Sequence, residues 1–327
     1  MPEGEGDRSR LNAPPAFRYT TPLCLTACVS RREPIVEDDL ISSLTSANPA
    51  RSLGVLEQLL EAAKSAGDAE GQALVLRRAA QVRFRAGELE AAAEACAAAA
   101  AVAEAAGLER LAAESRQGLA DAFAAMGRFA EGVAVYLECA DALDRCDRPG
   151  GAAACRAGAG RCLAAQGRTE DAERLFAESL QTAAATRDNA LASDCHAGLG
   201  EMAEDLGDLA GARDAYETAL VTAEEAGDAM RRANNSGRLA GALVRLEDFA
   251  AAEEHARLAA TLHSELAVDD LRALDLWHLG DALAGQGRMN EAREVLLEAA
   301  ALFGAAGAVE QQAEALRDAH ALTTRSE

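Results

Sequence analysis

One sequence pattern recurs at every fortieth position along most of this chain, and no other feature restricts its fold as strongly. Related segments such as RAGELEAA, AQGRTEDA and GQGRMNEA place a glycine at the same position of each unit. That position is occupied in successive units by Gly87, Gly127, Gly167, Gly207, Glu247 and Gly287. A fixed period of this length is typical of repeat proteins, in which each unit buries its apolar surface against its neighbours.

Each unit is predicted to be a pair of antiparallel helices. Apolar residues recur three and four positions apart, as at Leu276, Leu279 and Leu283, which is helical periodicity. A glycine just past a helix end can adopt the left-handed conformation that closes the last turn. Side-chain oxygens at four positions are expected to cap the next helix: Thr169, Asp208, Asp248 and Asn290. Small residues at two fixed positions let the paired helices approach closely: Ala92, Gly132, Ala172, Ala212, Ala252 and Ala292, and Ala80, Ala120, Gly160, Gly200, Ala240 and Gly280.

With these residues in place, the units resemble tetratricopeptide repeats. Aromatic or leucine residues occupy that family's packing positions: Leu89, Phe129, Leu209 and Phe249, then Tyr136, Phe176 and Tyr216, and also Leu119, Leu199, Leu239 and Leu279. The usual unit has about 34 residues, so this chain is similar to a long variant with about one extra turn per helix. The resemblance, which covers residues 36–322, implies an all-α, right-handed superhelical solenoid of antiparallel helix pairs. We expect about seven helical hairpins and a C-terminal capping helix.

The register of the repeat predicts the domain organisation. We expect a disordered N-terminal tail over residues 1–34, a degenerate N-terminal helix pair over 35–68, six repeats over 69–308, and a C-terminal capping helix and tail over 309–327. Pro149, with Gly150 and Gly151, predicts a loop between the second and third repeats, either a simple loop variant or a hinge. A misassigned start would also produce a segment like 1–33, so the sequence leaves open whether it belongs to the native chain.

The charge of the chain argues against phosphate-bearing partners. It has 32 Lys and Arg residues against 54 Asp and Glu residues, a formal net charge of −22. Nucleic acids would be repelled by this field. No run of 18 or more uncharged apolar residues occurs, so membrane insertion is not expected. Enrichment in Ala, Gly and Arg with almost no Lys suggests a GC-rich bacterial source.

The segment LTAC, which ends at Cys28, has the form of a lipoprotein cleavage site. The stretch before it is short, polar and interrupted by Pro22, and acidic residues stand where a signal peptide carries positive charge. We therefore expect a cytoplasmic protein. Lipidation at Cys28 is the alternative that the sequence leaves open.

No catalytic, metal or cofactor site is expected. GQGRMNEA follows a predicted helix and lacks the Gly-Lys-Ser/Thr of a phosphate loop, so it is a turn between helices. His255 and His263 lie eight positions apart, about 12 Å along a helix, which is too far to share one metal ion. His278 and Asp281 form only one weak pair of possible ligands. The sequence therefore predicts a protein that is not an enzyme.

Four cysteines with spacings of seven, nine and seven positions lie around Pro149. Two helices running in opposite directions would bring Cys146 near Cys155 and Cys139 near Cys162. Two disulfides would then be conceivable in an oxidising compartment. Alternatively, the four thiols are small buried hydrophobic groups, which is the more common use of free cysteine.

The family resemblance implies a concave groove, lined by the first helix of each unit, that receives extended peptides or helices. The matching positions predict a binding site formed by Arg77, Gln81, Arg85, Gln117, Asp121, Arg161, Glu201, Glu204, Asp205, Asn234, Arg238, Arg245, Trp277 and Asp281. Phe84, Asp194 and His278 are further groove positions, and the small residues Ala124, Ala157, Ala164 and Ala197 leave its middle shallow and open.

Two features of these positions suggest what a partner contacts. Leu276 takes the packing position, so Trp277 is expected to point into the groove, where Trp is a frequent binding hot spot. The alternative is that Trp277 packs internally. Acidic Glu201, Glu204 and Asp205 lie beside Asn234, Arg238 and Arg245. A partner with a basic stretch followed by an acidic one, or with a free carboxylate, would match this charge pattern.

The sequence thus predicts a non-enzymatic scaffold that binds a protein or peptide in its groove, without a cofactor. One alternative is a bacterial peptide-sensing regulator that acts on a separate effector protein. Another is an envelope-tethered lipoprotein assembly factor. The identity of the partner and the oligomeric state, including self-association, stay open.

Overall fold

The computed structural model describes residues 49–323, and this part of the chain is built from α-helices alone. The helices are α2 (Pro49–Ala66), α3 (Ala69–Arg85), α4 (Leu89–Ala105), α5 (Glu109–Ala125), α6 (Phe129–Arg145), α7 (Pro149–Ala165), α8 (Thr169–Thr186), α9 (Asn189–Asp205), α10 (Leu209–Ala226), α11 (Ala229–Arg245), α12 (Phe249–Glu265), α13 (Asp269–Gly285), α14 (Met289–Ala305) and α15 (Val309–Thr323). The all-α fold expected from the repeat is therefore confirmed. The predicted tail, Cys28 and the first helix of the degenerate pair lie outside the described residues.

The repeat unit is two helices long, because successive helices begin at positions 49, 69, 89 and so on to 309, which is half the period of the sequence repeat. The glycines between helices have positive φ, from 67° to 80°, as their predicted role in closing the helix ends requires. The same left-handed turn persists where the unit lacks glycine. Its φ is 56° to 61° at these positions: Asp147, Arg187, Glu247 and Ala267.

Two of the four predicted N-caps are confirmed. Asp208 accepts a hydrogen bond from the Gly211 main-chain nitrogen at 2.9 Å, and Asp248 caps α12 in the same way. Thr169 and Asn290 are not caps. They lie one and two positions later, inside the first turns of α8 and α14.

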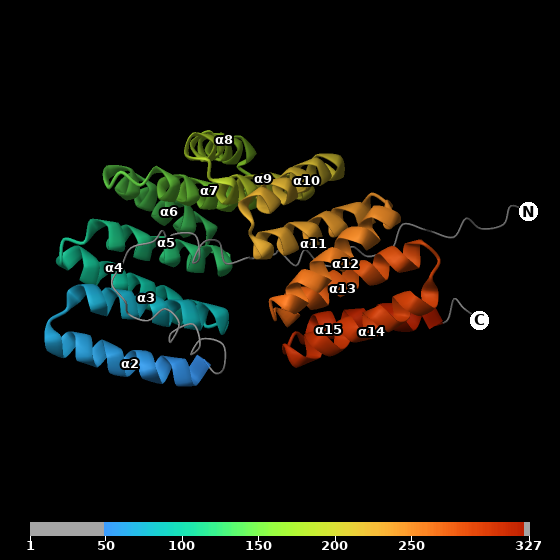
Figure 1. Cartoon of the computed structure of the whole chain (residues 1–327), viewed down its shortest axis with the longest axis horizontal. Coiled ribbons are helices and arrows are strands. Elements are labelled where there is room, and N and C mark those ends of the chain that lie inside the picture. Colours follow the sequence, from blue (N-terminus) through green and yellow to red (C-terminus); the bar gives the residue numbers. More distant parts are fainter. Residues whose placement is uncertain (1–48, 324–327) are drawn as a thin grey trace, which may run out of the picture. The chain divides into compact units, whose positions relative to one another are not determined.

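The described residues divide into two compact units, and the boundary lies inside α11, between Asn235 and Ser236. The N-terminal unit comprises residues 49–235, which Figure 1 colours from blue to yellow. The C-terminal unit comprises residues 236–323, coloured from yellow to red.

In the N-terminal unit, consecutive helices pack against one another as hairpins, and the first helices α3, α5, α7 and α9 also contact one another in turn (Figure 1). Its core consists mainly of alanine, with cysteine, leucine and the rings of Tyr136 and Phe176. Pro149 does not lie in a loop. It is the first residue of α7, where its fixed φ suits the helix and its missing N–H costs nothing.

Glycines on the first helices make room for aromatic rings from the second helices. A Cβ atom at Gly158 would lie 2.6 Å from Cζ of Tyr136, and one at Gly198 would lie 2.7 Å from the Phe176 ring. Each ring can therefore reach past the neighbouring first helix only because that position has no side chain. This packing carries the Tyr136 hydroxyl to the surface formed by the first helices.

The predicted cysteine neighbours are wrong. Cys139 Sγ lies 2.8 Å from Cys155 Sγ, both side chains are fully buried, and all six described cysteines are free. The turn between α6 and α7 is centred on Asp147 rather than on the Pro149 segment. Residues equally distant from Asp147 therefore meet across the hairpin, and Cys139 and Cys155 are each eight positions away.

In the C-terminal unit, α12 packs on α13, α13 on α14 and α14 on α15. Its core contains Trp277, whose ring meets Phe303 edge to face with centroids 5.8 Å apart. His263 and Asp275 are fully buried and join α12 to α13 through an Nδ1–Oδ2 contact of 2.6 Å. None of the described helices is long and apolar enough to cross a membrane.

Candidate functional site

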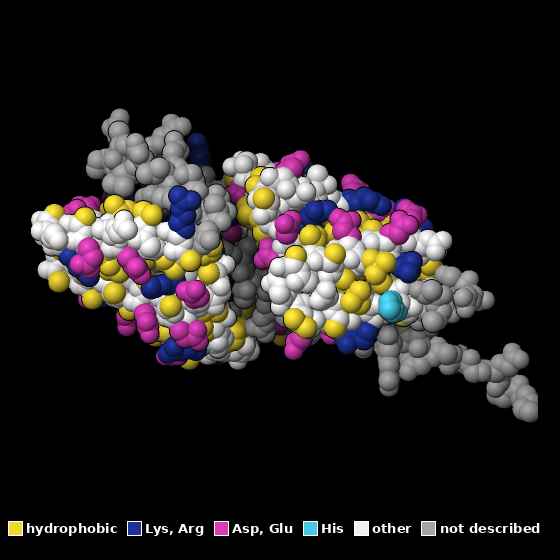
Figure 2. Space-filling view, turned by 90° about the horizontal axis from the view of Figure 1, so that it is seen from below, with side chains coloured by type: hydrophobic (Ala, Val, Ile, Leu, Met, Phe, Trp, Pro, Cys, Tyr) yellow, Lys and Arg dark blue, Asp and Glu magenta, His cyan; other side chains and the backbone are white. Residues whose placement is uncertain are grey.

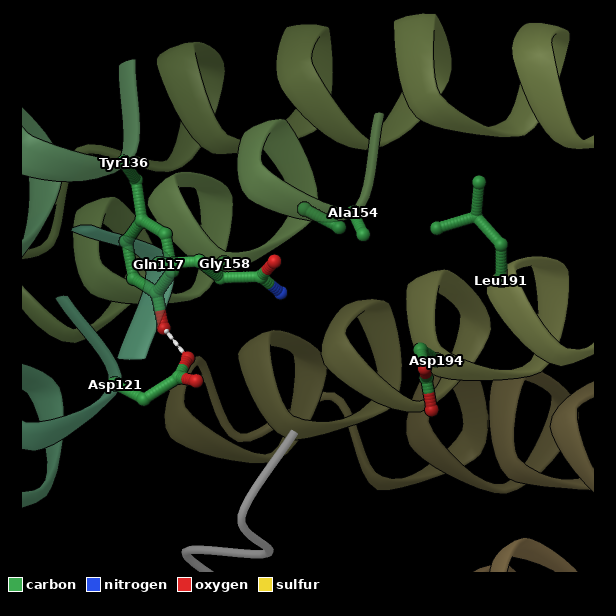
Figure 3. A pocket seen from close by; sticks show the side chains of 8 residues that line it. Gln117, Asp121, Tyr136, Ala154, Gly158, Leu191 and Asp194 are labelled. Carbon is green, nitrogen blue, oxygen red and sulfur yellow. Dashed lines mark hydrogen bonds between the residues drawn. The ribbon is translucent and has the colours of Figure 1, made fainter. Parts of the chain in front are cut away.

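A hollow lies on the face that the first helices present in the N-terminal unit. Its enclosed space is about 10 Å³, room for about one water molecule, within a concave region of about 250 Å³ that includes open solvent. Three first helices and one second helix supply its lining: Gln117 and Asp121 of α5, Tyr136 of α6, Ala154, Ala157 and Gly158 of α7, and Leu191 and Asp194 of α9. We call these residues the Asp121 hollow (Figure 3).

Asp121 is the most unusual group in the hollow. Its side chain is 6% exposed, and its Oδ1 accepts a hydrogen bond from the Tyr136 hydroxyl. Its second oxygen, Oδ2, is buried and has no hydrogen-bond partner within the described part of the chain. Burial raises the pKa of Asp121 to about 7, although the Tyr136 hydroxyl and the charge of Arg161 both act to lower it. A carboxyl group with an unsatisfied buried oxygen is costly unless another molecule or a proton satisfies it.

The opposite side of the hollow is held by a strong ion pair. Arg231 donates to both oxygens of Asp194, through Nε and Nη2, each at 2.9 Å. Arg231 also contacts Asp228, so its guanidinium group is shared by two carboxylates. This bidentate arrangement fixes the position of Asp194.

Gln117 lies between these two sides. Its amide projects into the space between Asp121 and Asp194 (Figure 3). Unlike Asp121 and Asp194, it takes part in no hydrogen bond with any residue in the range 49–323. The Gln117 side chain can therefore move without breaking a bond.

Arg161 is the positively charged residue predicted for this part of the groove. Burial acts to lower the pKa of its guanidinium group, but the charges of Glu201, Tyr136 and Asp194 outweigh burial and raise it. Arg161 thus stays charged beside several acidic groups.

The other groove residues predicted in the N-terminal unit have varied environments. Arg77 pairs with Glu114 at 3.0 Å, and Gln81 accepts a hydrogen bond from Arg78 at 3.0 Å. Glu204 accepts a hydrogen bond from the Tyr216 hydroxyl at 2.7 Å. Glu201 is partly buried, Arg85 and Asp205 are exposed, and Asn234 is buried.

In the C-terminal unit the expectation for Trp277 is wrong. Its side chain is only 4% exposed, and its Nε1 donates to Asp318 of α15 at 3.1 Å. Trp277 instead packs internally, as the alternative prediction had it, because α15 covers the position that would otherwise open toward a partner. Arg238, predicted beside it, is also buried, whereas Arg245 is exposed.

Asp281 lies one helical turn from Trp277 on α13. Burial, with a smaller contribution from the charge of Asp318, raises the pKa of Asp281 to about 7. Asp318 thus contacts the indole and also faces a second carboxyl group. The polar atom of the Trp277 indole is therefore satisfied within the C-terminal unit.

Sequence reasoning missed four members of the Asp121 hollow, among them Ala154 of α7. Tyr136 was interpreted only as a packing residue, and Gly158 and Leu191 were not singled out. The glycines in the segment AGAG, residues 157–160, carried a signal, because glycine inside a helix often marks the close approach of another group. Asp194 and Ala157 had been placed in the groove, and both line the hollow.

One face of the described residues is mixed in charge (Figure 2). On the face drawn in Figure 2, acidic side chains are interspersed with Lys and Arg side chains, and no continuous basic patch is visible there. No group of three or more His, Cys, Asp or Glu residues within the described range could hold a metal ion. The buried His263–Asp275 pair is sealed, since both side chains are 0% exposed.

Comparison with known proteins identifies the fold. No protein-family model matches the sequence, and no curated protein sequence matches it. Among solved structures, a Rap conjugation gene regulator of the plasmid pLS20 in complex with a Phr peptide aligns with a TM-score of 0.59 and 16% identity, over 80% of this chain and 76% of that one. A Rap protein complexed with competence and sporulation factor aligns with a TM-score of 0.56 and 14% identity, over 90% of this chain and 88% of that one.

A third structure has tetratricopeptide repeats by its own description. It is a signal transduction ATPase with numerous domains, from Pyrococcus horikoshii, with a tetratricopeptide repeat sensor. It aligns with a TM-score of 0.54 and 14% identity, over 83% of this chain and 44% of that one. The chain therefore has the fold of tetratricopeptide-repeat proteins, as its sequence predicted.

Proposed function

We propose that this protein is a non-enzymatic scaffold that binds an extended peptide or protein segment along the first helices of its N-terminal unit. The observation that carries the proposal is the Asp121 hollow, where four helices surround a concave space and leave a buried carboxylate oxygen unsatisfied. Such a concave site with few, well-placed polar groups is typical of ligand recognition. The Rap regulator of pLS20, which has the same fold, is in complex with a peptide, and this supports the proposal.

A peptide-sensing regulator is the second candidate. The Rap structure bound to a Phr peptide is that of a conjugation gene regulator, and the alignment spans most of both chains. A peptide in the Asp121 hollow would then control the binding of a separate effector protein. A cytoplasmic location and a bacterial source, both expected from the sequence, belong to this second candidate.

The absence of catalysis is also part of the proposal. A His–Asp pair can orient a catalytic base, but His263 and Asp275 are closed to any substrate because both are fully buried. Cys96 and Cys162, which lie near the hollow, do not suit nucleophilic catalysis either. Burial raises the pKa of Cys96 to about 12 and that of Cys162 to about 11, so both thiols stay protonated near neutral pH.

An array of short synthetic peptides of random sequence tests this function. Wild type should bind a subset of peptides, and Ala154→Phe should lose them, because the new ring fills the mouth of the hollow. Ala177→Phe, an equal change at an exposed position of α8, is the matched control and should bind like wild type. The proposal fails if wild type binds no peptide, or if Ala154→Phe binds the same peptides with unchanged affinity.

A further inference from the structure

The Asp121 hollow combines apolar walls with an acidic end. Ala154 and Ala157 of α7 and Leu191 of α9 form the walls, and Asp121 lies at the end nearest α6. The space is narrow because the Tyr136 ring passes next to Gly158 and fills the room behind it. A long, thin side chain with methylene groups and a polar tip fits this shape better than an aromatic ring does.

Both charged side chains that line the hollow itself are carboxylates, those of Asp121 and Asp194. Four carboxylates belong to its neighbourhood, namely Asp121, Asp194, Asp228 and Glu201. Two guanidinium groups face them: Arg231 pairs with Asp194 and Asp228, and Arg161 is attracted by Glu201 and Asp194. Among these carboxylates, Asp121 has a buried oxygen without a partner in residues 49–323, so it is the group with which an incoming cation would pair.

Oδ2 of Asp121 is the atom that this cation would contact. Oδ1 is already bound to Tyr136, whereas Oδ2 is buried without a partner in the described chain and points away from the ring (Figure 3). The amide of Gln117 also lines the hollow and is held by no hydrogen bond to residues 49–323. A side chain that enters the hollow past this mobile amide would reach Oδ2.

We infer that the Asp121 hollow receives a lysine or arginine side chain of the bound peptide, with the methylene stem against Ala154, Ala157 and Leu191 and the charged tip on Asp121. This inference rests on the proposed function and names the residue type that the site selects. A charge-assisted hydrogen bond to a buried carboxylate is worth about tenfold to a hundredfold in affinity. The carboxylates of Asp121 and Asp194 would repel acidic side chains, and the apolar walls favour a stem of methylene groups.

The binding should depend on pH in a defined direction. Burial raises the pKa of Asp121 to about 7, and the groups that face it are Tyr136 of α6, Arg161 and Cys162 of α7, and Cys96 of α4. A cation binds the ionised carboxylate, so protonation of Asp121 competes with the peptide. Affinity should therefore fall as the pH drops below about 7, by up to about tenfold per pH unit.

The same peptide array, probed one pH unit above the Asp121 pKa, tests this inference. Wild type should enrich peptides containing Lys or Arg over those containing Asp or Glu, and Asp121→Asn should lose that enrichment. Asp281→Asn, a change at the equivalent repeat position of the C-terminal unit, is the matched control and should keep it. Acetylated and free N-termini on the same peptides distinguish a side chain from the terminal amine, and an effect confined to free termini would contradict the inference.

A variant that binds more tightly than wild type cannot be explained by misfolding, as a variant that loses binding can. Gln117→Glu places one more carboxylate at the mouth of the hollow, so it should strengthen the binding of basic peptides. If wild type binds peptides without preferring basic ones, or if Asp121→Asn keeps the preference, the inference is overturned and the proposed function survives. If wild type binds no peptide, both are overturned.

Discussion

Two repeats of this protein place an aspartate and the residue one helical turn before it at equivalent positions, and use the two side chains differently. Gln117 and Asp121 lie on α5, and Trp277 and Asp281 lie on α13, four repeat units further along the chain. Around the first pair there is a hollow. Around the second pair the space is occupied, because the Trp277 indole packs on Phe303 and donates to Asp318.

The difference comes from the next first helix rather than from the pair itself. Gly158 of α7 lines the hollow together with Gln117 and Asp121. The equivalent position of α15, four repeat units later, is Asp318. Gly158 leaves space that the Tyr136 ring borders, whereas Asp318 supplies a carboxylate that satisfies the indole. A repeat position thus determines where a side chain lies, and the neighbouring repeat determines whether it is available to a partner.

The largest expected effect is a difference in the loss of stability between substitutions at the equivalent positions 277 and 117. Trp277→Ala should lower the free energy of unfolding by about 3–5 kcal/mol, as for other buried large aromatic residues. Gln117→Ala should lower it by less than about 1 kcal/mol, because the side chain makes no hydrogen bond within residues 49–323. Urea unfolding followed by circular dichroism measures both. Equal losses would remove the contrast between the two positions.

A smaller effect concerns the pH dependence of stability. Asp121 and Asp281 each have a folded pKa of about 7, above the unfolded value of 3.8, so the folded state binds more protons between these limits. The stability that these two carboxyl groups contribute is present below about pH 4 and is lost as the pH rises through about 7. Asp121→Asn and Asp281→Asn should each reduce that loss and be more stable than wild type above pH 7, by up to a few kcal/mol.

Thermal unfolding at a series of pH values checks this prediction. The stability of wild type should decline across the window from about 4 to about 7 and then level off. A stability that instead rises through this window in wild type, or variants that keep the full decline, would show that these carboxyl groups are not buried as described.

The smallest effects act on the pKa values themselves, in opposite directions in the two repeats. Asp318→Asn removes a negative charge near Asp281, so the pKa of Asp281 should fall, by up to about one unit. Tyr136→Phe removes a hydrogen bond that favours ionised Asp121, so the pKa of Asp121 should rise by a similar amount. Carbon-13 NMR titration of the carboxyl groups reports both, and shifts in the same direction would contradict the assigned neighbours.

Sequence reasoning predicted the helices and their register because both depend on local patterns. The glycine at every fortieth position marks a turn whose left-handed conformation is retained even at Glu247 and Ala267. Sequence reasoning also placed Gln117, Asp121 and Asp194 on one face, because side-chain direction follows from helical spacing. These are properties that one helix or one turn determines by itself.

The parts that could not be predicted depend on contacts between helices. The hydrogen bond from Tyr136 to Asp121 requires the ring to pass Gly158, which is a packing detail between α6 and α7. The burial of Trp277 depends on Asp318, which belongs to the next repeat unit. The approach of Cys139 to Cys155 depends on the centre of one turn, and a shift of that centre by a few positions changes every pairing across the hairpin.

The central question is whether the carboxyl group of Asp121 or that of Asp281 binds the partner. Carbon-13 NMR titration of Asp121 and Asp281, with and without a lysine-containing peptide selected on the array, makes this measurement. The account predicts that bound peptide lowers the pKa of Asp121 below about 7 and leaves that of Asp281 unchanged. A pKa change at Asp281 with none at Asp121 would contradict it, and would place the binding site in the C-terminal unit.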